Sequence, residues 1–540
     1  MNLCALRKQI QQMDIDTLLG QLLCYSVTPK WSEEEFAQIV RRTKPGGLFF
    51  NGTNGEFIRR YTQIANENLE IPVIVAADVE NGPGCALEGE ALLPFPMAWG
   101  AADDAALIEQ AGVATAAIAQ KNGIHWTFAP VVDLNQNPDN PVTNIRAISD
   151  SPEQVIKIGG AYMRGLQKEN RMVACCKHFP GDGVDDRNQH FCTTINSLSK
   201  EEWMATFGKV YQEMIRQGVG SIMVGHIALP AYDGEKVDEI LGYRPAIISK
   251  PLITDLLKGE LGFQGCVVSD ALSMIGSCSV LSEDKLVAGF IRAGGDMALF
   301  AQPVDFDRLK AAYEQGTLSE ERIRDAVLRV LQMKTQVGVL DGNTAKAPDP
   351  GLDIQTIGQK IAEKSIKIVR NAKQVLPVQL EAGDKVLVIN IQRVEETRVI
   401  SPFVRYMDTF EEELRSRGLT VESLTNPGHT TVKEKMQDTK TVFVNCKIGV
   451  HDYLGGSLRI AWPNIMLFWR GFLFNHPSVV FTSFGDPYKL HDFPYLYTYV
   501  NAFSSAEASQ RAAVQVLLGE KPCVAKNPVS HEGYFEREVE

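Results

Sequence analysis

The stretch MVACCKHFPGDGVDDRNQH, residues 172–190, contains the main evidence for the fold of the chain. Its first five residues form a continuous apolar run, typical of a buried strand, and the Pro and Gly residues within 180–183 then favour a mobile loop. We therefore predict that a strand carries Lys177 and His178 to its end and that the loop carries His190. Taken alone, two polar residues in this position are more typical of a strand that reaches solvent.

Length and composition limit the classes of protein that fit. The chain has 540 residues, which is too long for one ordinary core, and its 44% hydrophobic and 22% charged residues are ordinary globular values. The formal net charge is −12, and we find no cluster of Lys and Arg that would neutralise phosphates. The sequence therefore argues against a nucleic-acid partner.

Ten cysteines at irregular spacings include no Cys-x-x-Cys pair, and Cys175 and Cys176 are adjacent inside the predicted buried strand. Such cysteines are typical of a reducing compartment, and they indicate neither a disulfide framework nor a zinc site. The apolar run Leu18–Val27 is too short to cross a membrane and lacks a small-residue cleavage site. We predict a cytoplasmic protein with no membrane span, no metal and no cofactor.

Eight short apolar runs precede residue 301, and stretches of helical character separate them. Continuous apolar runs are typical of parallel strands that are covered on both faces. After Pro152, apolar residues at 155, 158, 162 and 166 show helical spacing. Eight strand and helix pairs in about 300 residues predict a (β/α)8 TIM barrel. The runs are Leu22–Val27, Gly47–Phe50, Pro72–Asp78, Trp126–Asp133, Met172–His178, Ser221–His226, Gly265–Asp270 and Asp296–Phe300.

Polar residues end five of these runs. In a (β/α)8 barrel the carboxyl ends of all strands open on one face, which is where active sites lie. One such residue has little weight, but five that converge on one face favour a functional site. The residues are Asp78, Asp133, Lys177 with His178, His226 and Asp270.

The C-terminal part of the chain predicts a second α/β domain. A segment rich in Pro, Gly, Asn and Asp at 341–351 and a helix over Ile354–Asn371 lead into it. The predicted strands are Lys385–Ile391, Thr441–Cys446 and Ser478–Phe484, and the predicted helices are Val404–Arg417 and Glu507–Leu518. This alternation predicts a three-layer α/β/α sandwich. The predicted domains are the barrel at 1–340, the linker and connecting helix at 341–371, and the sandwich at 372–540.

Several motifs together resemble glycoside hydrolase family 3, in its β-N-acetylglucosaminidase branch. The resemblance spans residues 15–340 and extends into the second domain. The combination of motifs is specific, whereas any one of them alone would not be. The motifs are Lys177–Gly183 with His190, Val267–Met274, Phe128–Asp133, Asn144–Arg146, Gly225–Pro230, Ala362–Ile366 and Ser483–Tyr488.

The resemblance implies roles for the polar residues. It makes Asp270 the nucleophile of a retaining glycosidase and His190 its general acid and base, a role that an imidazole can fill near neutral pH. It assigns Asp78, Lys177 and His178 to the sugar hydroxyls and Arg146 to the N-acetyl side of the sugar. We interpret Asp133 and His226 as structural or supporting residues.

Two departures from the family pattern limit these assignments. The family has an arginine after the third-strand aspartate, and residues 81–85 contain none. The family also pairs its loop histidine with an aspartate two residues earlier, where this chain has Asn188. An asparagine carries no charge, so Asn188 would orient His190 without stabilising its protonated form. Asp185 and Asp186 are alternative sources of that charge.

The sequence therefore predicts a retaining hydrolase that removes terminal β-linked N-acetylglucosamine from small glycoconjugates, either peptidoglycan fragments or chito-oligosaccharides. Its expected partner is this small carbohydrate, and the oligomeric state stays open. Three alternatives use the same scaffold: a β-N-acetylglucosamine phosphorylase, a β-glucosidase, and a catalytically weakened sugar-binding protein.

Overall fold

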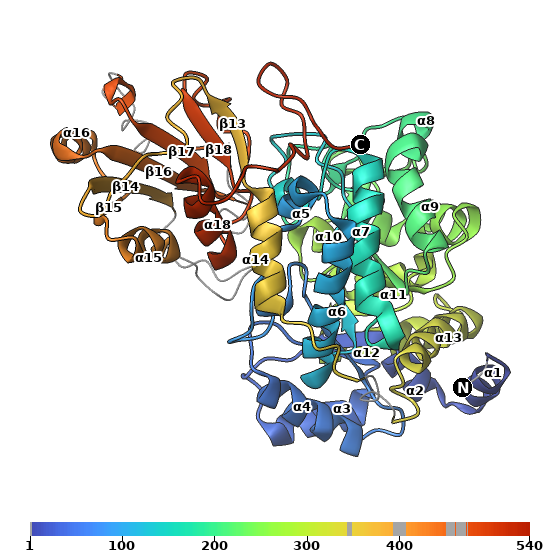
Figure 1. Cartoon of the computed structure of the whole chain (residues 1–540). Helices are drawn as coiled ribbons and strands as arrows, with labels where there is room; N and C mark the ends of the chain where they lie inside the picture. The colour runs from blue at the N-terminus through green and yellow to red at the C-terminus, as the bar shows by residue number, and fades with distance from the viewer. Residues whose placement is uncertain (1–2, 343–347, 393–406, 450–458, 461–470, 472) are drawn as a thin grey trace. The chain divides into compact units, whose positions relative to one another are not determined.

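The computed structural model of the protein describes residues 3–342, 348–392, 407–449, 459–460, 471 and 473–540 (Figure 1). These residues separate into two compact units. The first contains residues 1–90, 109–134 and 155–352, and the second contains residues 91–108, 135–154 and 353–540. Two segments from the first 160 residues therefore belong to the same unit as the C-terminal part of the chain.

All eight predicted strands of the first unit form, each somewhat shorter than its apolar run. Every pair among them is parallel. Their core residues are buried, as expected for strands that are covered on both faces. They are β1 (Leu23–Ser26), β2 (Gly47–Phe49), β3 (Ile74–Ala77), β4 (Trp126–Thr127), β5 (Cys175–Phe179), β7 (Ser221–Val224), β11 (Cys266–Ser269) and β12 (Ala298–Ala301).

These strands form two sheets, in the orders β12-β1-β2-β3-β4 and β11-β7-β5. Single parallel bridges connect the sheets at both edges, because Trp126 pairs with Val173 next to β5 and Val268 of β11 pairs with Met297 next to β12. Neighbours in space are thus neighbours in chain order. The architecture is mixed α/β, with parallel strands linked through helices.

The strand ends carry most of the predicted polar residues, with two corrections. Asp133 does not end a strand, because β4 stops at Thr127, before Pro130, which has no N–H to donate to a neighbouring strand. Asp78 and Asp270 directly follow β3 and β11, and His226 lies two residues beyond β7. Lys177 and His178, however, lie inside β5, which continues to Phe179. The strand continues because Phe179 pairs with Val224 of β7 after an irregularity in register, so the prediction that β5 ends at His178 was wrong.

Long helices follow most of these strands. The helix predicted from Pro152 is α7 (Pro152–Gln167), and its residues Val155, Ile158, Tyr162 and Leu166 are fully buried, which confirms the predicted spacing. Helices α3 and α4, on either side of β2 in the chain, pack side by side (Figure 1). The other helices of this part of the chain are α1 (Leu3–Gln12), α2 (Ile15–Gly20), α3 (Glu33–Thr43), α4 (Gly55–Glu67), α6 (Ala105–Lys121), α8 (Lys200–Trp203), α9 (Lys209–Arg216), α10 (Ile275–Cys278), α11 (Glu283–Ala293), α12 (Pro303–Glu314) and α13 (Glu320–Gln336).

The second unit is built on a six-stranded sheet in the order β13-β18-β17-β16-β14-β15. Only the pair of β13 and β18 is antiparallel among these described strands. The strands are β13 (Lys367–Asn371), β14 (Lys385–Gln392), β15 (Thr420–Thr425), β16 (Thr441–Lys447), β17 (Val479–Ser483) and β18 (Thr498–Asn501). The helices are α5 (Pro96–Ala102), α14 (Ile354–Ser365), α15 (Asp408–Ser416), α16 (His429–Lys435) and α18 (Glu507–Leu517).

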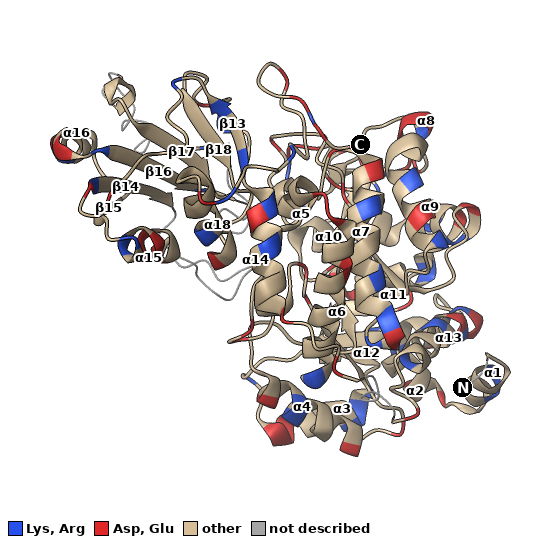
Figure 2. Ribbon diagram, viewed as in Figure 1, with Lys and Arg blue, Asp and Glu red and all other residues tan. Residues whose placement is uncertain are grey.

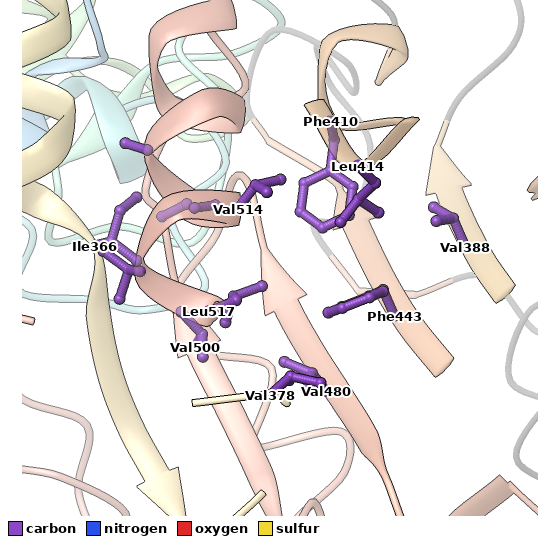
Figure 3. Packing of buried hydrophobic residues seen from close by; sticks show 14 of the residues in the cluster. Ile366, Val378, Val388, Phe410, Leu414, Phe443, Val480, Val500, Val514 and Leu517 are labelled. Atoms are coloured by element: carbon purple, nitrogen blue, oxygen red, sulfur yellow. The ribbon is translucent and has the colours of Figure 1, made fainter. Parts of the chain in front are cut away.

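Alternating side chains of β14 explain why both faces of this sheet are covered. Val386 and Val388 face a core formed with α14, α15 and α18, part of which Figure 3 shows around Phe410 and Val480. Leu387 and Ile389, one residue out of phase, face a second core that includes Val432 of α16. A strand that is apolar on both faces belongs to the interior of an α/β structure.

Predictions for the second unit were incomplete. The helix predicted over Ile354–Asn371 ends at Ser365, because the β-branched residues after it pair as β13 with β18. Strands β15 and β18 and helix α16 were not predicted. Helix α15 lies within the predicted Val404–Arg417, of which residues 404–406 lie outside the described residues.

Charges of both signs are interspersed along the helices of the first unit, as on α9 and α13 (Figure 2). Among the described residues, no helix combines the length and the apolar character that a membrane span requires.

Candidate active site

Asp270 lies at the carboxyl end of β11, where two hydrogen bonds to neighbouring backbone groups hold it. Its N–H donates to the carbonyl of Val224 at 2.9 Å, and its Oδ1 accepts the N–H of Ala271 at 2.7 Å. Burial alone would raise the pKa of Asp270, but positive charge on the protonated imidazoles of His178, His226 and His190, together with the N–H of Ala271, lowers it below its usual value. Asp270 is therefore held as a carboxylate, the form that a nucleophile needs.

A buried carboxylate holds His178 in place. Asp133 Oδ2 lies 2.7 Å from His178 Nδ1, and Asp133 Oδ1 accepts the N–H of His178 at 3.0 Å and the N–H of Asp182 at 2.9 Å. Asp133 is fully buried. A carboxylate only accepts hydrogen bonds, so Nδ1 of His178 carries a hydrogen. Nε2 of His178 is then the ring nitrogen that can contact a substrate. Asp133 thus orients a residue of the site.

Lys177 joins two carboxylates from the segment after β3. Its Nζ lies 3.1 Å from Asp78 Oδ1 and 2.6 Å from Glu80 Oε1. Lys177 and Glu80 are buried, whereas Asp78 is partly exposed. Glu80 is the member of the site that sequence reasoning missed. The signal was its position two residues beyond Asp78, because alternate residues of an extended chain face the same side.

Asn188 orients His190. Its Oδ1 accepts the backbone N–H of His190 at 2.9 Å and lies 2.7 Å from His190 Nδ1. The backbone amide can only donate, which assigns the oxygen of Asn188 to this position and the hydrogen of the ring to Nδ1. In neutral His190 the lone pair is therefore on Nε2, the arrangement of a general base.

The neutral amide at position 188 is enclosed. Asn188 is buried, and its Nδ2 has no hydrogen-bond partner among the described residues. Asp185, which we considered as a substitute charge, has its carboxylate bound to Arg187 and to the N–H of Ile195. Asp186 is exposed. The partner of His190 Nδ1 is therefore Asn188.

The loop that carries His190 is anchored to the neighbouring strand ends. Buried Gln189 accepts the N–H of His226 through its Oε1 at 3.1 Å. The backbone of Gln189 also lies directly against Gly276 in α10, where a Cβ would stand 2.2 Å from the carbonyl oxygen of Gln189. Only a glycine fits this close approach, which links the segment after Asp270 to the segment that holds His190.

We expect Gly276→Ala to lower turnover about tenfold or more without unfolding the protein, because the added methyl must push the carbonyl of Gln189 and displace His190. The change should be measured as kcat for an alkyl glycoside together with thermal unfolding. Gly234→Ala is the matched control, since its nearest neighbour would be 3.6 Å from the new Cβ. Equal kcat for the two variants would contradict the link between the segments.

Arg146 belongs to the second unit. It ends a short 3-10 helix, Asn144–Arg146, and is buried, and its Nη1 donates to the carbonyl of Val142 at 3.3 Å. Asn140 shapes the preceding turn by accepting the N–H groups of Val142 and Thr143. The contact of Arg146 with the sugar stays a prediction.

A carboxylate kept ionised by imidazoles, at the carboxyl ends of parallel strands, is the arrangement of an enzyme active site. A model of the glycosyl hydrolase family 3 N-terminal domain matches residues 6–333. The chain belongs to glycoside hydrolase family 3.

Relatives cover nearly the whole chain. The β-N-acetylglucosaminidase/β-glucosidase of Cellulomonas fimi is 30% identical over 97% of this chain and 95% of its own length. The solved β-glucoside phosphorylase BglX bound to 2FGlc has a TM-score of 0.86 and 27% identity, over 98% of this chain and 96% of that one. The solved structure of a family 3 β-N-acetylglucosaminidase from Paenibacillus sp. str. FPU-7 has a TM-score of 0.83 and 25% identity, and the match covers 96% of this chain and 99% of that one.

Proposed function

We propose that the protein is a retaining glycoside hydrolase that removes terminal β-linked N-acetylglucosamine through a covalent glycosyl-enzyme intermediate. One observation carries this proposal: the carboxylate of Asp270 lies within the electrostatic reach of His190, an imidazole whose tautomer suits a general base. Retaining hydrolysis needs one carboxylate nucleophile and one group that gives and takes a proton. Membership of family 3 and the name of the Cellulomonas fimi relative support the same activity.

In the first step, Asp270 attacks the anomeric carbon while the bond from that carbon to the leaving oxygen breaks. His190, protonated on Nε2, gives its proton to the leaving oxygen. In the second step, neutral His190 takes a proton from water, the water oxygen bonds to the anomeric carbon, and Asp270 is released as a carboxylate. Two inversions at one carbon retain the β configuration.

The sugar-binding roles go to charged or ionisable side chains. Asp78, Lys177 and His178 bind the sugar hydroxyls, since hydrogen bonds to charged groups such as Asp78 and Lys177 are strong and directional. Glu80 and Asp133 hold Lys177 and His178 in position. The place of Arg146 on the N-acetyl side stays what the family resemblance implies. The substrates are small glycoconjugates, peptidoglycan fragments or chito-oligosaccharides.

The scaffold that we infer is a (β/α)8 barrel followed by a three-layer α/β/α sandwich. The parallel order of the eight strands and the bridges at both sheet edges support the barrel. Apolar cores on both faces of the six-stranded sheet support the sandwich. The cytoplasm is the location that we propose, because ten unpaired cysteines, several of them buried, are typical of a reducing compartment.

The sugar preference tests the proposed function. We expect kcat/KM for nitrophenyl β-N-acetylglucosaminide to exceed that for the β-glucoside by at least about tenfold, because a pocket that recognises the acetamide is left with unpaired buried polar groups when the acetamide is missing. Both substrates have the same leaving group, so the comparison isolates the sugar. An equal or higher value for the glucoside would contradict the proposal.

Phosphorolysis is the second candidate function, and the contact of Asn188 with His190 favours it. Water needs a base to become nucleophilic, whereas an anion such as phosphate arrives nucleophilic already. An uncharged partner weakens His190 as a base, because it does not stabilise the imidazolium. The structural similarity to a β-glucoside phosphorylase supports this candidate as well.

We expect aryl glycosides to give a burst, slow turnover in water and faster turnover with added phosphate, and Asn188→Asp to raise the rate in water. In a serine-protease triad, exchanging aspartate for asparagine costs about 10⁴ in kcat, which sets the upper limit of the gain. The product, free sugar or sugar 1-phosphate, is to be identified at each phosphate concentration. The absence of a burst, of a phosphate effect and of a gain in Asn188→Asp would together exclude this candidate.

A further inference from the structure

We infer that Phe191 and Ile275 form an apolar contact surface for the leaving group, so that the enzyme prefers glycosides whose aglycone presents an apolar or aromatic face. This inference rests on the proposed function, because it takes Asp270 and His190 as the reacting pair.

Both side chains are exposed although they are large and apolar. Phe191 is 49% exposed and Ile275 is 53% exposed. Each follows a reacting residue closely in the chain: Phe191 is the residue after His190, and Ile275 begins α10 five residues after Asp270. Single exposed apolar residues are normal on protein surfaces, so exposure alone carries no argument.

The backbone brings the two segments together. Gly276 lies against the carbonyl oxygens of Gln189 and Cys192, where its Cβ would stand at 2.2 Å and 3.1 Å. Thr193 Oγ1 donates to the carbonyl of Gly276 at 3.5 Å. The residues that flank these contacts are Ile275 on one segment and Phe191 on the other. Two exposed apolar side chains therefore stand on adjoining pieces of backbone beside the reacting pair.

The reaction mechanism places the leaving group of the substrate beside His190. General acid catalysis requires His190 within hydrogen-bond reach of the oxygen that leaves, so the aglycone begins next to His190. The residues assigned to the sugar, Asp78, Lys177 and His178, are charged or ionisable and suit hydroxyl groups. An apolar pair beside His190 suits instead an aromatic ring or the apolar face of a second sugar, which packs against aromatic side chains.

The test compares benzyl and methyl β-N-acetylglucosaminides. Both leaving groups are simple alcohols of similar acidity, so they need His190 equally and differ mainly in the apolar ring. We expect Phe191→Ala to lower kcat/KM about fivefold for the benzyl glycoside, the scale of one aromatic contact, and to leave the methyl glycoside unchanged. Ile275→Ser should act in the same direction. Leu3→Ala, which removes an exposed apolar side chain from α1, is the control.

Two results would overturn the inference. If Phe191→Ala lowered both substrates equally, Phe191 would act only by positioning His190. If neither variant changed the ratio of benzyl to methyl values, the two side chains would not contact the aglycone. The same ratio can be measured with β-glucosides. An enzyme that cleaves only glucosides would contradict the proposed sugar specificity, while the ratio would still decide the aglycone surface.

Discussion

Asp270→Ala is expected to fold normally and to lose turnover by about 10⁴- to 10⁶-fold, the range found when a member of a covalent catalytic set is removed. The loss should be this large because the carboxylate is held ionised by three imidazoles and forms the bond to the anomeric carbon. Steady-state rates with nitrophenyl β-N-acetylglucosaminide, together with thermal unfolding, measure both parts of the expectation.

The control for this variant is Asp255→Ala, which removes an exposed aspartate of the same unit and should leave kcat unchanged. Added azide should partly restore cleavage by Asp270→Ala, because a small anion can occupy the space that the carboxylate leaves and attack the anomeric carbon. The azide product should have the inverted configuration. Substantial activity of Asp270→Ala without any added anion would remove Asp270 from the mechanism.

His190→Ala is expected to lower kcat/KM by about 10²- to 10⁴-fold for an alkyl glycoside, the usual contribution of general acid catalysis. Nitrophenyl glycosides should lose far less in kcat/KM, because nitrophenolate leaves without a proton. Measuring both substrates separates acid catalysis from a general disturbance of the site. The control is His429→Ala, since His429 is an exposed histidine on α16 of the second unit. Equal losses with the two leaving groups would show that His190 does not act as the acid.

The strands were predictable from the sequence because their apolar runs are continuous, and continuous runs are what parallel strands buried on both faces require. The polar residues at their ends were predictable for a related reason, since Asp78, His226 and Asp270 interrupt runs that are otherwise apolar. Strands β4 and β5 were the exceptions. Strand β4 ends at Thr127, well before Asp133. The pairing of β5 with β7 extends β5 past Lys177 and His178, and pairing between distant segments leaves no local signal.

Other features depended on contacts that one sequence does not display. Glu80 stands two residues beyond Asp78, which suggests a shared side, but the sequence does not show that Lys177 reaches both carboxylates. The orientation of Asn188 follows from the backbone N–H of His190, whereas the sequence left Asp185 and Asp186 open as alternative partners of the imidazole. The close contact at Gly276 was likewise hidden, because a glycine can serve a turn as readily as a close approach.

The sequence also did not predict that residues 91–108 and 135–154 belong to the second unit. Both segments lie between elements of the first unit in the chain, and nothing in their composition marks them as different. Hydrogen bonds from Lys364 to Asp104 and from Lys526 to Asp103 tie the first of these segments to the C-terminal part. Domain membership here follows from tertiary contacts and not from the order of the chain.

The most direct test of the account is to trap the intermediate. A fluorinated N-acetylglucosaminyl fluoride that forms the glycosyl-enzyme quickly and releases it slowly should add the mass of one sugar to the intact protein. Peptide mapping should then place the sugar on Asp270. A sugar attached to another residue, or rapid turnover of ordinary substrates with no adduct at any time, would contradict a covalent mechanism through Asp270.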